Sequence, residues 1–344
     1  MVKVITLLKY LSVVAIISIL VYFVFAEIGI YEIYNTIKEM NTLYLALSFL
    51  AATLYMFMWN IRGYYILRSF KKKVKYFALL PIFLAGILLN TITPGARAGG
   101  EPVKALYMAK RFKITKTKAF AATILNIIHN FFIFGLLSLF SILFVIIYIN
   151  VPGVIKTFLI TFLFAVPALI ILLFLIKRRI KNLILRRLLG SLYHTFLFNK
   201  IREKFDTHRK FEVYINRKLR IFSKAIKKSL KNKKDFTIGV VTTVLFYVFR
   251  YVTVYLLFLG LGQEVKFIPV IIVVTLATLF GDLSFTPGGI GMTEGLMIAL
   301  YLAFAINPAV AVIVTFLDRV YYYFYALFLG TIAFIYMTLR KKWS

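Results

Sequence analysis

No cysteine occurs in these 344 residues. The chain therefore forms no disulfide, has no thiolate nucleophile and binds no metal through cysteine. Acidic residues are also scarce, with 12 Asp and Glu against 43 Lys and Arg. The three histidines, His129, His194 and His208, are too far apart in the sequence to indicate a metal cluster. We therefore expect neither a metal nor another cofactor.

Several enzyme signatures are missing as well. The chain contains no Gly-x4-Gly-Lys-Ser/Thr phosphate loop, no His-Glu-x-x-His zinc motif and no Gly-x-Ser-x-Gly nucleophile elbow. A membrane-embedded transferase is disfavoured because no paired nucleophile and base is evident. We expect no ATP hydrolysis and no catalysis by this chain.

Apolar residues make up 62% of the chain, and the mean hydropathy is +0.89. Several apolar runs are long enough to cross a bilayer. A formal charge of +31 would suggest nucleic acid as the partner of a soluble protein, but no zinc-finger or RNA-recognition pattern supports that interpretation. In a membrane protein such a charge is typical of cytoplasmic loops that face anionic lipid. The sequence predicts an all-α, polytopic integral membrane protein with one transmembrane domain over residues 1–344.

One pattern, Thr-Pro-Gly followed by five residues and Glu, occurs twice. It reads TPGARAGGE at residues 93–101 and TPGGIGMTE at residues 286–294. Proline removes a backbone donor and glycine tolerates unusual dihedral angles, so each copy should break a helix. Broken helices occur within membranes only where protein buries them or where they line a cavity. We therefore expect these two copies to form the functional centre.

Flanking charge predicts the topology. About six full spans are expected, near residues 1–26, 43–60, 119–148, 155–176, 236–261 and 309–339. We interpret the first as an uncleaved helix. Arg62, Arg68 and the lysines of residues 71–75 should form a basic cytoplasmic loop, and the basic C-terminus should also be cytoplasmic. The prediction is a multi-pass protein of the cell membrane with both termini in the cytoplasm.

The two broken segments, residues 76–118 and 267–306, should be re-entrant hairpins of half-helices. The first has basic flanks on both sides and should enter from the cytoplasm, whereas the second should enter from outside. Such an inverted repeat is typical of transporters with a midplane site built from discontinuous helices.

Residues 177–235 form a basic insertion with 20 Lys and Arg residues against four acids. Its latter part has an apolar stripe at helical spacing, which indicates a basic amphipathic helix. Such a helix could lie on the anionic inner leaflet or could belong to a solvated cytosolic hairpin.

Arginine and glycines at the two breaks are candidates to bind a lipid phosphate. Arg97 could bind phosphate in a bidentate manner, and backbone N–H groups at the ends of half-helices could also bind the anion. The full candidate set is Arg97, Gly95, Gly99, Gly100, Lys104, Gly288, Gly289 and Gly291.

Ionisable residues within apolar segments are candidates for proton coupling or for structural ion pairs. Glu101 and Glu294 could instead stabilise the first turn of a half-helix through its dipole. Arg250 could pair with Asp282, Asp318 or Glu294. His129 could relay protons or simply pack with Asn126 and Asn130. The full set is Glu101, Asp282, Glu294, Arg250, Asp318, Arg319 and His129.

The motifs PGxRxGGEPxK at residues 94–104 and PGGIGxxEG at residues 287–295 resemble the paired motifs of the lysylphosphatidylglycerol synthase/flippase transmembrane family. That family includes the lipid-flipping domain of bacterial aminoacyl-phosphatidylglycerol synthases, stand-alone membrane proteins and the membrane portion of certain archaeal dolichyl-phosphate hexosyltransferases. The resemblance covers essentially the whole chain and implies a membrane protein that handles phosphate-bearing lipids.

Two hypotheses follow from the residues and the resemblance. The first is a flippase-like translocator of phospholipids or polyprenyl-phosphate-linked lipids, which would bind the headgroup at the paired breaks. The second is a non-catalytic partner that recruits or regulates a lipid-modifying synthase or glycosyltransferase through the basic insertion.

Overall fold

The computed structural model of the chain describes residue 35 and residues 38–70, 73–93, 99–149, 153–175 and 208–339. Within these ranges every regular element is a helix, which confirms the predicted all-α class. The chain forms two compact units, residues 1–150 with 229–344, and residues 151–228. The predicted span at residues 1–26 lies outside the described residues.

Four helices in the described part of the chain are long and apolar enough to cross a membrane. They match the spans predicted near residues 43–60, 119–148, 236–261 and 309–339, and the protein is a polytopic membrane protein. The last one runs from α14 through the π-helical segment η3 into α15. The bounds are α3 (Thr42–Phe70), α6 (Lys116–Tyr148), α11 (Lys233–Gly260), α14 (Pro308–Tyr323), η3 (Phe324–Leu329) and α15 (Gly330–Leu339).

Helix α3 continues ten residues beyond the predicted end of its span at residue 60. Arg62 and Arg68 therefore belong to a helix, and their assignment to a loop was wrong. The physical reason is burial, because Ile66 and Leu67 in this last part of α3 are almost completely inaccessible to solvent. Arg62 is itself buried, whereas Arg68 is exposed.

Two pairs of shorter helices occupy the regions predicted to be broken. The first pair is α4 (Tyr76–Ile92) and α5 (Gly100–Phe112), and the second is α12 (Phe267–Leu283) and α13 (Met292–Ala303). These helices have 17, 13, 17 and 12 residues, fewer than the roughly 20 that a span requires. Each pair packs together as a helical hairpin.

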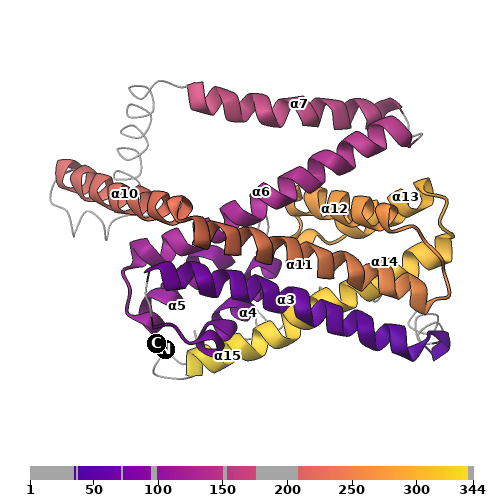
Figure 1. Cartoon of the computed structure of the whole chain (residues 1–344), viewed down its shortest axis with the longest axis horizontal. Helices are drawn as coiled ribbons and strands as arrows, with labels where there is room; N and C mark the ends of the chain where they lie inside the picture. Colours follow the sequence, from indigo (N-terminus) through magenta and orange to yellow (C-terminus); the bar gives the residue numbers. More distant parts are fainter. Residues whose placement is uncertain are drawn as a thin grey trace, which may run out of the picture. The chain divides into compact units, whose positions relative to one another are not determined.

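The two hairpins point in opposite directions along the long helices. Helices α3 and α11 pack along each other, and Asn41 at the start of α3 donates its N–H to the carbonyl of Gly260 at the end of α11. The first hairpin follows the end of α3, and the second follows the end of α11. They therefore enter the bundle from opposite ends, as the inverted repeat predicted (Figure 1). Which end faces the cytoplasm stays a prediction.

The main hydrophobic core lies among α3, α11, α12, α13 and α14. Val254, Leu257 and Phe258 of α11 are completely buried, and the Phe258 ring packs edge-on against Tyr301 of α13 at 5.2 Å. Hydroxyl pairs join α3 to the last long helix, with 2.8 Å between Ser48 and Tyr321. This packing fixes the long helices around the tips of the two hairpins.

The second unit contains α7 (Gly153–Leu175) and most of α10 (His208–Lys231). Helix α7 corresponds to the span predicted at residues 155–176. Helix α10 corresponds to the predicted amphipathic helix, and exposed basic residues such as Arg217, Arg220 and Lys224 occur along it. Residues 177–207 of the basic insertion lie outside the described residues.

Candidate functional site

The second Thr-Pro-Gly copy breaks the chain between α12 and α13. After Leu283 the backbone turns through the short 3-10 segment η2 (Pro287–Gly289) before α13 begins. Gly288, Gly289 and Gly291 have φ angles of 63°, 73° and 80°. Side chains rarely tolerate this left-handed region, so the turn depends on glycine at these three positions.

The tips of the two hairpins meet inside the bundle. A Cβ atom built on Gly288 would lie 3.1 Å from the Cγ2 atom of Thr91, near the end of α4. The Thr91 hydroxyl is in turn 2.9 Å from the hydroxyl of Tyr322 in α14. The end of α4, which precedes the first break, and the second break therefore lie side by side next to α14.

A cavity of about 370 Å³ opens at this meeting point. Its walls come from both hairpins and from α3, α6, α11 and α14. This volume falls within the range of about 300–1,000 Å³ that is usual for ligand sites. The charged residues that line it are Arg62, Glu101, Arg250, Asp282 and Arg319.

Arg250 forms a buried ion pair with Asp318 of α14, one of the three partners considered for it. The guanidinium donates through both terminal nitrogens, with 2.7 Å between Nη2 and Oδ2, and the second bond joins Nη1 to Oδ1. Arg250 also lies 5.8 Å from the ring of Tyr55. The charge of Arg250 is therefore compensated within the protein, which favours a structural role.

Glu294 has two partners at the start of α13. Its Oε2 atom accepts the backbone N–H of Gly291 at 2.7 Å, which caps the helix. Its Oε1 atom is 3.2 Å from Nε of Arg319. Glu294 therefore combines the expected capping role with a charge pair across the cavity wall.

Glu101 pairs with Lys104 one turn further along α5. Lys104 is buried, and its Nζ atom lies 5.4 Å and 5.1 Å from the ring centres of Trp59 and Phe83, within cation–π distance. Glu101 lines the cavity, but Lys104 is not among the lining residues. Lys104, which was predicted to bind the phosphate, thus does not line the cavity.

Arg62 has the most informative environment in the cavity. Its Nε donates to Oδ1 of Asn126 at 2.7 Å, and its Nη1 donates to the Thr243 hydroxyl at 2.9 Å and to Oδ1 of Asn130 at 3.4 Å. All these partners are neutral. Within the described part of the chain, no carboxylate lies within 4.0 Å of the Arg62 guanidinium. Among these residues, a cation that is 2% exposed therefore lines the cavity without a carboxylate in direct contact.

Three of the backbone N–H groups considered for phosphate binding already donate hydrogen bonds to other groups of the protein. Gly100 donates to Oδ1 of Asn90 at 2.7 Å, Gly289 donates to the carbonyl of Thr286 at 3.1 Å, and Gly291 donates to Glu294. Gly99 and Gly100 instead permit close packing: a Cβ on Gly100 would lie 2.1 Å from the carbonyl oxygen of Gly86. Arg62 is thus better placed than these N–H groups to meet an anion.

The remaining candidates form no hydrogen bond with Arg62 or lie outside the described residues. Asp282 lines the cavity near the end of α12. His129 is buried against Gly239 of α11, with Nδ1 at 2.8 Å from the Leu125 carbonyl, and it does not line the cavity. Gly95 and Arg97 lie outside the described residues.

Sequence reasoning missed Arg62 because basic residues follow it closely and made it resemble part of a loop. Two signals could have identified it. Gly63 is the only glycine or proline between residues 42 and 70, so nothing ends the helix at Asn60. In addition, the polar face of Asn126 and Asn130 in α6 required a buried partner.

The sequence is similar to proteins of one membrane family. The profile of the family described as the lysylphosphatidylglycerol synthase TM region matches residues 10–330. A UPF0104 membrane protein of Methanocaldococcus jannaschii is 29% identical over 96% of this chain and 94% of its own length. UPF0104 membrane proteins of Methanothermobacter thermautotrophicus and Pyrococcus horikoshii are each 26% identical, over 85% and 87% of this chain and 85% and 89% of their own lengths.

Proposed function

Because the chain belongs to the family of the lysylphosphatidylglycerol synthase TM region, we propose that it translocates phosphate-bearing lipids across its membrane. Phospholipids and polyprenyl-phosphate-linked lipids are the substrate classes that fit. The observation that carries this proposal is Arg62, a buried cation in the cavity between the two broken hairpins whose hydrogen-bond partners among the described residues are all neutral. A lipid phosphate would supply the missing anion and would accept charge-assisted hydrogen bonds from the guanidinium.

The opposed hairpins suggest how the cavity could open to either side of the membrane. Each hairpin reaches the cavity from a different end of the bundle, so movement of one tip would expose the headgroup to one leaflet at a time. Translocation breaks no bond of the lipid, and we propose no catalytic step. Glu101 and Asp282 line the cavity, and Glu294 pairs with its lining residue Arg319; these acids could couple the path to protons, with His129 as a further relay.

Charge distribution guides the proposed orientation. The basic insertion and the basic C-terminus would face the cytoplasm, which places both termini there in a cell membrane. Exposed basic residues on α10 would contact the anionic inner leaflet. The same basic surface also supports the second candidate function, recruitment of a lipid-modifying enzyme.

A reconstitution assay tests the function. Purified protein in liposomes should translocate fluorescent phosphatidylglycerol or polyprenyl phosphate, and should leave a fluorescent diacylglycerol-like lipid without phosphate at the background rate. A pH gradient of either sign should change the rate if protons are coupled. Folded protein that moves none of these lipids would contradict translocation. The recruiting role would then be tested by deleting residues 177–234 and measuring loss of the partner enzyme.

A further inference from the structure

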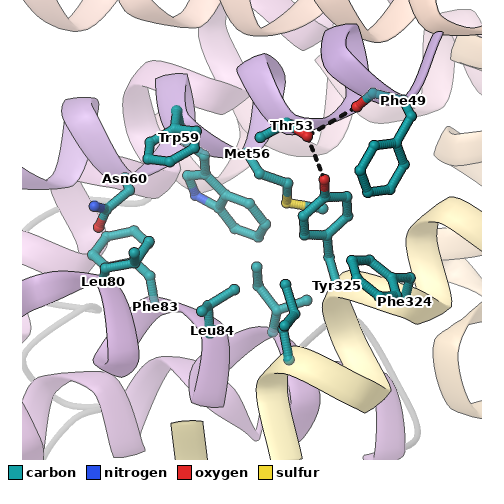
Figure 2. A pocket seen from close by; sticks show the side chains of 13 residues that line it. Phe49, Thr53, Met56, Trp59, Asn60, Leu80, Phe83, Leu84, Phe324 and Tyr325 are labelled. Atoms are coloured by element: carbon teal, nitrogen blue, oxygen red, sulfur yellow. Dashed lines mark hydrogen bonds between the residues drawn. The ribbon is translucent and has the colours of Figure 1, made fainter. Parts of the chain in front are cut away.

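A second cavity, of about 350 Å³, lies between α3, α4 and the π-helical segment η3 (Figure 2). Its lining is mostly aliphatic and aromatic and includes Leu80, Phe83 and Leu84 from α4 and Phe324 and Leu329 from η3. π-Helical turns are uncommon and are frequent at functional sites. The volume lies within the usual range for ligand sites, and the lining selects an apolar occupant.

The hydroxyl groups at this cavity are already hydrogen-bonded. Thr53 and Tyr325 are 2.6 Å apart, and the Thr53 hydroxyl also contacts the carbonyl oxygen of Phe49 at 2.9 Å (Figure 2). Neither hydroxyl therefore needs water or a polar ligand. Asn60 of α3 also belongs to the lining, but it is 1% exposed and offers the cavity almost no polar surface. A hydrocarbon chain therefore suits this space better than a polar molecule.

The apolar cavity adjoins the polar one. Met56, Trp59 and Ile87 line both cavities and form the wall between them. Arg62 follows Trp59 by three residues on the same helix and lines the polar side. Methionine is flexible, so this part of the wall can adapt to a chain that passes from one cavity to the other.

The apolar cavity also reaches the surface of the protein. Phe49, one of its lining residues, is 40% exposed in the first third of the apolar helix α3, within the span predicted at residues 43–60. Exposed apolar side chains at this position of a spanning helix face the hydrocarbon of the bilayer. A lipid chain could thus enter from the membrane without crossing water.

We propose that the apolar cavity holds one hydrocarbon chain of the translocated lipid while its phosphate lies beside Arg62. This inference rests on the proposed function and extends it to the hydrophobic part of the substrate. Two adjoining cavities, one lined by a buried cation with neutral hydrogen-bond partners among the described residues and one lined mostly by apolar side chains, match an amphiphile with an anionic head. The protein thereby holds both parts of the lipid.

Photocrosslinking in liposomes tests this inference. A phosphatidylglycerol with a diazirine at the end of one chain should attach to residues of α3, α4 and η3 that line the apolar cavity. Leu84→Trp fills the cavity and should lower this crosslinking severalfold. Phe328→Trp is the matched control, because Phe328 is 58% exposed and lines neither cavity. Leu329→Phe fills the cavity from the opposite wall and replaces Leu84→Trp if that variant does not fold.

Specificity supplies the second readout. Excess unlabelled phosphatidylglycerol should suppress the crosslinks, and excess diacylglycerol should not. Equal suppression by both lipids would overturn the inference, as would crosslinks that persist in both filling variants. These outcomes would leave translocation intact, since the fluorescent-lipid assay measures it independently of where the chain lies.

Discussion

Replacing Arg62 with glutamine should lower the rate of phosphate-lipid translocation about 10- to 100-fold. Charge-assisted hydrogen bonds contribute about 1.5–3 kcal/mol, and each 1.4 kcal/mol corresponds to about a factor of ten. Glutamine can still donate to the neutral partners Asn126 and Thr243, so the helices should stay packed. The measurement is the initial flipping rate of fluorescent phosphatidylglycerol in liposomes.

Arg68→Gln is the matched control for this prediction. Arg68 lies in the same helix and carries the same charge, but it is exposed and contacts the hydroxyl of Tyr64 at 3.3 Å. Its replacement should leave the flipping rate close to that of the wild type. A folded Arg62→Gln protein with an unchanged rate would remove Arg62 from the proposed mechanism.

Replacing Asp318 with leucine should destabilise the protein by about 3–5 kcal/mol. The substitution leaves the Arg250 guanidinium buried without its carboxylate partner, and an uncompensated buried charge carries a penalty of this size. Thermal unfolding of the purified protein in detergent should report a clearly lower midpoint temperature than the wild type.

The double variant Arg250→Met/Asp318→Leu provides the control. It removes both charges and keeps side chains of similar size, so most of the lost stability should return. If the double variant were as unstable as Asp318→Leu alone, loss of packing rather than an unpaired charge would be the cause. If the double variant recovers its stability and flips lipid at the normal rate, the Arg250–Asp318 ion pair has a structural role and no role in translocation.

The sequence was sufficient to predict the architecture because the relevant signals are local. Long apolar runs determine the spanning helices, and proline with glycine determines where α12 ends and α13 begins. The opposed hairpins follow from the order of the helices. Burial of Arg250 with an acid was also predictable, because an ionised group in an apolar span needs a partner.

The details of the site depend on contacts that the sequence does not display. Asn90 accepts a hydrogen bond from the N–H of Gly100, and the Lys104 ammonium lies over the Trp59 ring. Both contacts arise because α4, α5 and α3 pack together. No local pattern in the sequence shows that Lys104 pairs with a carboxylate whereas Arg62 has neutral hydrogen-bond partners. The neutral surroundings of Arg62 therefore emerge only once α3, α6 and α11 are placed side by side.

The absence of native cysteine allows the central claim, that a lipid phosphate occupies the cavity beside Arg62, to be tested directly. Thr278→Cys places a unique thiol in the cavity wall, and Gln263→Cys places one in the exposed turn after α11 as the control. A water-soluble thiol reagent should label both. Phosphatidylglycerol should slow labelling at position 278 only, diacylglycerol should slow neither, and Arg62→Gln should abolish the protection. Equal labelling at position 278 with and without phosphatidylglycerol would contradict the account.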